Sequence, residues 1–388
     1  MPPDATPDSG QREYIRPTSL EIATCAVIGR SEAAVSLVPT SRDPLEALEK
    51  ALLPALARPP CVVSFSGGRD SSAVLAVALQ VARHEGLPAP VALTIRWPAY
   101  PETDESEWQE LVAKNLGVGE WEKIEFEENE VIGPTFAPSL KRLGVLWPPL
   151  LHSWPPIFRR AEGGSFVTGE GGDEVLGDRR CSWLRRVLWG KPNKAILIGT
   201  ARSLAPKAYR RQAALRTYKR DVLTPWLRPE ARRLYLELLA TNTAAEPYRW
   251  GAGMRWHLES RSVVVGSHNL ALLAAEQGTV LYEPLLDPGF VGSLLPMAGA
   301  LGFPGRTGAM RALFSGLLPD DVLARRGKAY TTSMVFGERS RDFISGWGGE
   351  GLDDGLVDPE GLATAWKCET PPPGTLLLLQ KAWLASLS

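Results

Sequence analysis

The sequence predicts an α/β fold built on a doubly wound parallel sheet, with helices on both faces, and two observations indicate it. From residue 61 to about residue 168, short apolar runs alternate with longer segments of helical spacing, which is the pattern of strands joined by crossover helices. Two of the apolar runs end in a glycine-rich loop. Such loops, at the carboxyl edge of a parallel sheet, are typical of nucleotide-binding folds.

Three segments precede this alternating region. Residues 1–18 are polar and rich in proline, so we expect a disordered tail. Residues 20–37 contain alternating and apolar stretches, which predict a short β-rich segment with a hairpin turn at residues 29–31. Residues 44–56 have the spacing of a helix.

The alternating region and the remainder of the chain differ in their predicted elements. Strands are expected at 61–66, 91–97, 121–126 and 165–168, and helices at 71–85 and 104–116. Beyond about residue 200 the chain is mostly helical, with no clear strand. We therefore expect a disordered tail (1–18), a short N-terminal segment (19–58), a nucleotide-binding core (59–200) and a C-terminal, mainly helical substrate-binding region (201–388).

The first glycine-rich loop has the sequence SFSGGRDSS at residues 64–72 and lies between a predicted strand and a predicted helix. Its two glycines allow backbone N–H groups to approach a phosphate, and the following helix presents its positive end. The serine hydroxyls add further donors. Asp70 places a carboxylate in this anion site, which favours a Mg²⁺ ion between Asp70 and the phosphates. The expected nucleotide-binding residues here are Ser64, Ser66, Gly67, Gly68, Asp70, Ser71 and Ser72.

The second glycine-rich loop, TGEGGDEVLG at residues 168–177, also follows a short apolar run. It holds three carboxylates, Glu170, Asp173 and Glu174, within five residues. A donor-rich loop and an acid-rich loop on two parallel strands suit a nucleotide with its metal ion. We therefore expect Asp70 and Asp173 to hold Mg²⁺, and Thr168 and Gly169 to contact the nucleotide.

These two loops resemble those of the asparagine synthetase branch of the ATP-pyrophosphatase family, which includes β-lactam synthetase and the lasso-peptide cyclases. Three more stretches fit that branch: TDE at 103–105, EPLLDP at 283–288, and LLP at 317–319 followed by RRGKAYTT at 325–332. The resemblance extends from about residue 59 to 330. It implies a sheet of the adenine-nucleotide alpha-hydrolase (PP-loop) type, with ATP and Mg²⁺ as cofactors. It also implies that a carboxylate is adenylated, that pyrophosphate is released and that an amine attacks.

The resemblance also implies roles for single residues. Ile95 is either an adenine contact or an ordinary isoleucine of the sheet. Arg306 takes the place of a lysine charge found in relatives. Lys328 is expected to be catalytic, stabilising negative charge either at the α-phosphate or on the tetrahedral intermediate. The attacking amine must lose a proton, and two candidates for the base are Glu170 and His268, although His268 equally fits the edge of a helical apolar pattern.

Family members that hydrolyse glutamine begin with a cysteine and carry a whole amidotransferase domain, whereas about sixty residues precede the first loop here. We therefore expect no glutaminase activity on this polypeptide. The resemblance favours amide or macrolactam formation in specialised metabolism, of the lasso-cyclase or β-lactam-synthetase kind. Two alternatives stay open: an ammonia-dependent subunit similar to asparagine synthetase, and an inactive partner protein that keeps the fold. The expected partners are a carboxylate substrate, which a precursor peptide could provide, an amine and a possible partner protein.

Composition agrees with a cytoplasmic enzyme that binds neither nucleic acid nor membrane. The net charge is −1 and the pI is about 6.5, so no strong field attracts polyanions. The N-terminus lacks the features of a signal peptide. Four scattered cysteines indicate neither a zinc site nor a disulfide framework. The arginines at 179–186 and 202–220 form either a solvated helix face or a site for an acidic peptide or partner.

Overall fold

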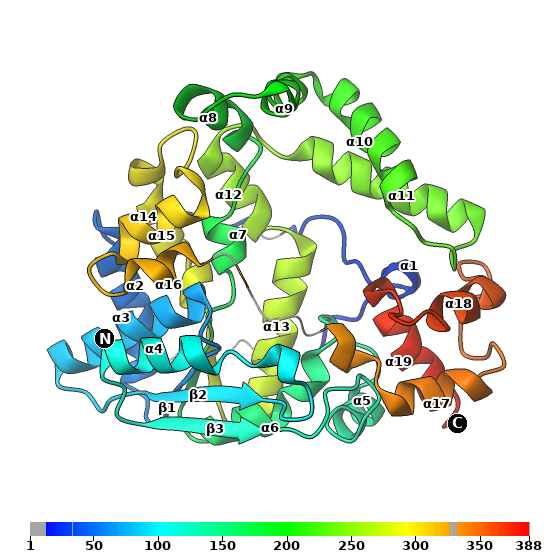
Figure 1. Ribbon diagram of the computed structural model, residues 1–388, viewed down its shortest axis with the longest axis horizontal. Coiled ribbons are helices and arrows are strands. Elements are labelled where there is room, and N and C mark those ends of the chain that lie inside the picture. Colours follow the sequence, from blue (N-terminus) through cyan, green and yellow to red (C-terminus); the bar gives the residue numbers. More distant parts are fainter. Residues whose placement is uncertain (1–12, 33, 326, 328–331, 388) are drawn as a thin grey trace.

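The computed structural model describes residues 13–32, 34–325, 327 and 332–387. Its strands form a single parallel sheet, which lies in the lower part of the view in Figure 1. The strand order is β3-β2-β1-β4-β5, and every pairing is parallel. The predicted α/β fold is therefore confirmed. The strands are β1 (Cys61–Ser64), β2 (Val91–Arg96), β3 (Trp121–Glu125), β4 (Ser165–Val167) and β5 (Val280–Tyr282).

Helices make up most of the remaining chain. The α-helices are α1 (Ser19–Thr24), α2 (Pro44–Leu56), α3 (Arg69–Glu85), α4 (Ser106–Leu116), α5 (Ala137–Leu143), α6 (Pro155–Phe158), α7 (Gly172–Leu176), α8 (Ser182–Trp189), α9 (Lys194–Leu204), α10 (Lys207–Asp221), α11 (Pro229–Ala245), α12 (Trp250–Leu258), α13 (Arg261–Glu276), α14 (Pro288–Ala298), α15 (Gly305–Phe314), α16 (Asp320–Ala324), α17 (Glu338–Gly346), α18 (Pro359–Trp366) and α19 (Leu376–Ala385). Short 3₁₀ turns are η1 (Pro101–Thr103), η2 (Leu151–Ser153), η3 (Arg159–Ala161), η4 (Pro284–Leu286), η5 (Thr332–Val335) and η6 (Pro373–Thr375).

The two faces of the sheet bury different cores, as a doubly wound fold requires. Successive strand residues point to opposite faces. Val63 of β1 belongs to a core with residues of α2, α3 and α14, whereas its neighbour Val62 belongs to a core with residues of α6 and α13. Phe166 and Val167 of β4 divide between the same two cores. A third core joins α1, α11, α18 and α19, which lie on the opposite side of the view from β1 (Figure 1).

The predicted strands begin at the observed residues and end one or two residues later than the observed ones. The helix predicted at 44–56 matches α2, and the helices predicted at 71–85 and 104–116 correspond to α3 and α4. Apolar periodicity therefore located four strands of the sheet and the helices α2, α3 and α4, with differences only at some of their ends.

The prediction of a β-rich N-terminal segment is wrong, because residues 19–24 form the helix α1. Thr18 and Glu21 form a reciprocal capping box, in which the Thr18 N–H donates to Glu21 Oε2 (2.8 Å) and the Glu21 N–H donates to Thr18 Oγ1 (3.3 Å). This pair satisfies helix N–H groups that would otherwise lack partners. Cys25, with a φ of 47°, ends the helix. In the described part of 20–37, β-pairing is limited to one isolated bridge between Arg30 and Ser260.

The expected disorder of residues 1–18 is wrong for residues 13–18, whereas residues 1–12 lie outside the described residues. The Ile15 N–H donates to Asn269 Oδ1 (2.9 Å), and Asn269 Nδ2 donates back to the Ile15 carbonyl (3.0 Å). Asn269 is fully buried on α13. The N-terminal segment is therefore fixed along this helix.

The fifth strand was not predicted. Val280 of β5 pairs with Ser165 of β4, so a strand from beyond residue 200 completes the sheet. The division at residue 200 therefore does not separate the sheet from the helices, and the domain boundaries themselves stay predictions.

The four cysteines are free thiols, as expected from their spacing. Cys61 and Cys181 are buried, and burial raises the pKa of both thiols. None of the helices in the described ranges is both long enough and apolar enough to cross a membrane.

Candidate nucleotide-binding site

The loop between β1 and α3 is held by hydrogen bonds among its own serines. The Ser66 N–H donates to Ser71 Oγ (3.2 Å), and the Gly68 N–H donates to Ser66 Oγ (3.3 Å). Gly67 has a φ of 77°, a conformation that favours glycine. The turn therefore presents the amino end of α3, with the positive end of its dipole, at the edge of the sheet.

The second loop fits against the first because its glycines lack side chains. A Cβ atom at Gly169 would lie 2.8 Å from the backbone N of Ser71, and one at Gly172 would lie 2.2 Å from Asp70 Cγ. Gly171 has a φ of 92°, and a Cβ there would overlap Leu286 of η4. At Gly169 the neighbouring atoms are backbone, whereas at Gly171 and Gly172 a larger residue would have to displace the side chain of Leu286 or Asp70. The two predicted loops are thus interlocked.

Three charged side chains meet where the loops touch. Arg306 of α15 forms ion pairs with both Asp70 and Asp173. The Arg306 and Asp70 side chains are only 23% and 18% exposed, whereas that of Asp173 is 69% exposed. The Asp70 Oδ1 atom is buried and has no hydrogen-bond partner among the described residues.

These two carboxylates fit a Mg²⁺ ion. Both face the space that one guanidinium fills, and oxygen atoms are the ligands that Mg²⁺ prefers. Within the described residues, no group of three His, Cys, Asp or Glu side chains is arranged as a metal site. The two aspartates are therefore suited to share an ion with nucleotide phosphates, as Mg²⁺ is commonly bound, and not to enclose it alone.

A cavity of about 490 Å³ lies over the two loops. Most of the predicted site residues line it, and they come from both loops and from α15. The lining residues are Ser64, Ser66, Gly68, Arg69, Asp70, Ser71, Trp154, Thr168, Gly169, Glu170, Gly171, Gly172, Asp173, Glu174, Arg306, Arg325 and Gly327. Gly67 and Ser72 are not among them, and Ser72 is fully buried.

A smaller cavity of about 140 Å³ adjoins the first. The two share Ser64, Ser66 and Gly68. Ile95 of β2 lines the smaller cavity together with apolar residues that include Phe65 and Leu93. Ile95 therefore lies next to the loop between β1 and α3.

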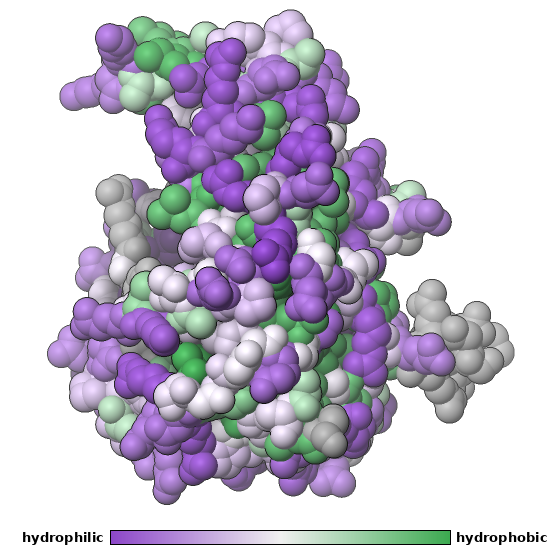
Figure 2. Space-filling model, turned by 90° about the vertical axis from the view of Figure 1, so that its right-hand side faces the viewer, coloured by the Kyte–Doolittle hydropathy of each residue, from purple (hydrophilic) through white to green (hydrophobic). Residues whose placement is uncertain are grey.

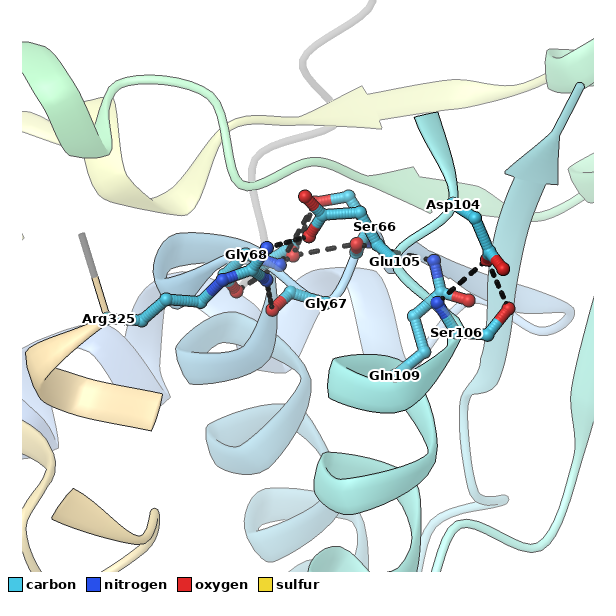
Figure 3. A network of polar contacts seen from close by, with 9 residues as sticks. Ser66, Gly67, Gly68, Asp104, Glu105, Ser106, Gln109 and Arg325 are labelled. Atoms are coloured by element: carbon cyan, nitrogen blue, oxygen red, sulfur yellow. Dashed lines mark hydrogen bonds and ion pairs between the residues drawn. The ribbon is translucent and has the colours of Figure 1, made fainter. Parts of the chain in front are cut away.

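A second network fixes the first loop from outside (Figure 3). Arg325, just after α16, donates to the Gly67 carbonyl (2.9 Å) and forms an ion pair with Glu105. The guanidinium also lies 4.6 Å from the centre of the Trp108 ring, within range of a cation–π interaction. The Arg325 and Glu105 side chains are 7% and 11% exposed, so this ion pair is shielded from water. Nearby, Gln109 Nε2 donates to the Ser66 carbonyl (3.4 Å).

The other predicted catalytic residues are His268 and Lys328, and the structure describes only the first. His268 is on α13 and does not line the cavity, and its Nε2 atom forms a hydrogen bond with the Glu13 carbonyl (2.9 Å). This placement agrees with the reading of His268 as a residue at the edge of a helical apolar pattern. Lys328 lies outside the described residues, although the adjacent Arg325 and Gly327 line the cavity.

The structure adds residues for which the sequence indicated no role. Trp154 lines the cavity and stacks on Phe158, with ring centres 5.3 Å apart. No local motif surrounds Trp154. Glu105 and Arg325 lie within two of the stretches that resemble the family, so the sequence could have predicted that both are near the site. It could not have predicted the ion pair between them.

Glu283, directly after β5, is a further acidic group beside the site. Burial raises the pKa of its carboxyl, a hydrogen bond from Ser267 lowers it in part, and the nearby Glu170 and Glu174 carboxylates raise it. A carboxyl with a raised pKa close to two other carboxylates adds proton-binding capacity to this edge of the sheet.

The chain matches the asparagine synthase family over residues 45–370, and it belongs to this family. No curated protein matches it. Family membership and the fold together support an ATP-dependent ligase that forms amide or other C–N bonds.

Proposed function

We propose that the protein activates a carboxylate as an acyl-adenylate, releases pyrophosphate and transfers the acyl group to an amine. The observation that carries this proposal is the interlock of a donor-rich loop with an acid-rich loop beneath one cavity. A loop that grips the β- and γ-phosphates leaves the α-phosphorus open to the carboxylate. AMP and pyrophosphate are then the nucleotide products.

Each loop contributes a different part of the chemistry. The Gly68 N–H, the hydroxyls of Ser66 and Ser71 and the amino end of α3 bind the pyrophosphate that will leave. Asp70 and Asp173 would hold Mg²⁺, which supplies positive charge against the charge that develops on the leaving group. Arg306 neutralises the two aspartates before the nucleotide binds and lies close enough to contact phosphate afterwards.

The second half of the reaction needs a base and a stabilising charge. Glu170 lines the cavity and is the candidate to accept the proton of the attacking amine. Lys328 is proposed to stabilise the negative charge of the tetrahedral intermediate. Arg325, three positions before Lys328 in the sequence, donates to the Gly67 carbonyl, which supports a role for this segment of the chain at the site.

Within this reaction class we propose amide or macrolactam formation in specialised metabolism, with a peptide carboxylate as the acyl donor and an amine of the same peptide as the acceptor. The support is the resemblance of both loops and of the RRGK segment to lasso-peptide cyclases and β-lactam synthetase. The proposed setting is the cytoplasm, with a precursor peptide as the partner.

The test is to identify the nucleotide product. The full chain is incubated with Mg²⁺, α-labelled ATP and a panel of acceptors: aspartate with ammonia, and peptides that carry both an Asp or Glu side chain and a free amine. We expect AMP and pyrophosphate, and a peptide product lighter by one water. Asp70→Asn should abolish both, whereas Asp342→Asn, at an exposed position of α17, should abolish neither.

The other outcomes separate the alternatives. Asparagine formed from ammonia would identify the ammonia-dependent synthetase. ATP binding without turnover of any acceptor would support the inactive partner. ADP as the nucleotide product would refute the proposed adenylation.

A further inference from the structure

Positive charge is concentrated in one segment of the chain. Residues 179–220 contain thirteen Lys and Arg and no Asp or Glu. The rest of the chain has thirty Lys and Arg against forty-four Asp and Glu. The net charge of −1 is therefore the sum of a strongly basic segment and an acidic remainder of the chain.

The basic segment forms most of an arm, defined here as residues 182–245 with helices α8 to α11. In Figure 1 these helices lie at the top and upper right of the view, above the sheet. None of the residues of α10 is buried. The arm therefore presents much of its surface to solvent and not to the core of the protein.

Large apolar side chains are exposed on the arm between the basic ones. Figure 2 shows hydrophobic atoms among strongly hydrophilic ones at the top of the molecule, at the height of α8 and α9. The residues of this apolar set on and between α8, α9 and α10 are Leu188, Trp189, Leu197, Ile198, Leu204 and Tyr209, with exposed fractions from 42% to 68%. Exposed apolar groups bordered by polar ones mark interaction surfaces.

A cavity of about 600 Å³ lies between the packed pair α8 and α9 and the packed pair α10 and α11. Its apolar lining includes Trp183, Ile198 and Ala213, and its basic lining includes Arg202 and Arg210. The arm thus offers a concave apolar site with cations at its border.

Most of these cations form no ion pair with the described residues, although Glu246 attracts Arg179, Arg180 and Arg210 at longer range. Of the thirteen, Arg185, Arg186, Arg211 and Arg220 form ion pairs. The other nine have no carboxylate within 4.0 Å in the part of the chain that the structure describes. The single carboxylate among the residues lining the cavity, Glu246, accepts a hydrogen bond from the backbone of Arg180 (3.0 Å).

We propose that the arm binds an acidic amphipathic helix of a partner polypeptide. Its apolar face would fill the cavity, as in helix-in-groove recognition, and its acidic residues would meet the unpaired arginines. A flat bilayer cannot enter a concave site, and an apolar lining does not suit a phosphate backbone, so the shape and chemistry favour a peptide. The proposal does not depend on the proposed reaction, because no residue of the arm lines the nucleotide cavity.

The probe for the test is a labelled 18-residue peptide with leucines at helical spacing and glutamates on the other positions. A peptide of the same composition but scrambled order removes the apolar face. Binding to the full chain is followed by fluorescence anisotropy. We expect the patterned peptide to bind at least about tenfold more tightly than the scrambled one. Equal affinities, or tighter binding of single-stranded DNA or of anionic phosphatidylserine vesicles, would overturn the proposal.

Matched variants locate the binding site. Ile198→Ser changes a cavity residue that is 42% exposed, and its control, Leu111→Ser, changes a residue of α4 that is 41% exposed. Arg202→Glu is paired with Arg339→Glu, at an exposed position of α17. We expect each arm variant to weaken peptide binding about tenfold and each control to leave it unchanged. All four variants should show the thermal unfolding transition of the wild type, followed by circular dichroism, which shows that they are folded. Unchanged peptide affinity in both arm variants would refute the assignment.

Discussion

The contact between the two glycine-rich loops makes Gly172→Ala a direct test of the proposed metal site. A Cβ atom at position 172 would lie 2.2 Å from Asp70 Cγ and 2.4 Å from its Oδ1, whereas ordinary contacts begin at 3.4 Å, so the Asp70 carboxyl must move by about 1.2 Å. The backbone of Gly172 is helical, at the start of α7. Alanine therefore adds no backbone strain there. The substitution should move a metal ligand without unfolding the protein.

The expected loss follows from this displacement. A shift of about 1 Å in a positioned group costs about a hundredfold in rate, and disturbing the surroundings of a metal site typically costs about 10–100-fold in metal affinity. ATP binding is measured by calorimetry at several Mg²⁺ concentrations. We expect Gly172→Ala to require about 10–100-fold more Mg²⁺ and to bind metal-free ATP as the wild type does.

The matched control is Gly119→Ala, at a position where a Cβ atom would meet nothing within 4 Å. This variant should behave as the wild type. If Gly172→Ala also keeps the wild-type Mg²⁺ dependence, Asp70 is not a metal ligand.

Three further predictions concern the surroundings of the site. Lys328→Ala should still release pyrophosphate in a single turnover but form amide about a hundred- to a thousandfold more slowly, and equal loss of both steps would instead assign the lysine to adenylation. Arg325→Ala should lower the free energy of unfolding by about 3–5 kcal/mol, because Glu105 is left buried without its partner. Denaturant titration measures this, and adding Glu105→Gln should restore most of it. The raised pKa of Glu283 means that the folded state binds a proton more tightly than the unfolded state. The Glu283 carboxyl therefore lowers the free energy of unfolding once the pH rises above the ordinary pKa of a glutamate. Glu283→Gln should therefore raise Tm at pH 7 and leave it unchanged at pH 4, and a variant that is no more stable at pH 7 would contradict this account.

Local sequence signals were sufficient for four of the five strands and for the two loops. In β1 and β4 the apolar runs are short and end at glycines, so both the strand and its functional loop are read from about ten consecutive residues. The same method failed at the N-terminus, where apolar residues 22–28 suggested a strand. The capping sequence of Thr18 and Glu21 was present there and predicts a helix. This helix signal was available, but the apolar run was given more weight.

Other parts of the site depend on tertiary packing. Val280–Tyr282 is a strand of three residues at the edge of the sheet, as short as β4. No glycine-rich loop follows it to mark it in the sequence, and its pairing with β4 defines it. Arg306 lies 236 positions after Asp70, and its charge reaches the loops because α15 packs against α7. The sequence identified Arg306 only as a substitute for a lysine, and the contact with both aspartates required the folded chain.

The path of the chain between β4 and β5 has a consequence for how such a protein can diversify. The chain leaves the sheet at Val167 and returns at Val280, beside the strand that it left. Because β4 and β5 pair directly, the pairing fixes only the two ends of the segment between them, residues 168–279. This connecting segment can therefore accept insertions of different length and composition. The arm lies within this connecting segment. Mutations that lengthen, shorten or replace it can accumulate while the glycines that interlock the loops stay constrained, so selection can alter what the protein associates with separately from how it handles ATP.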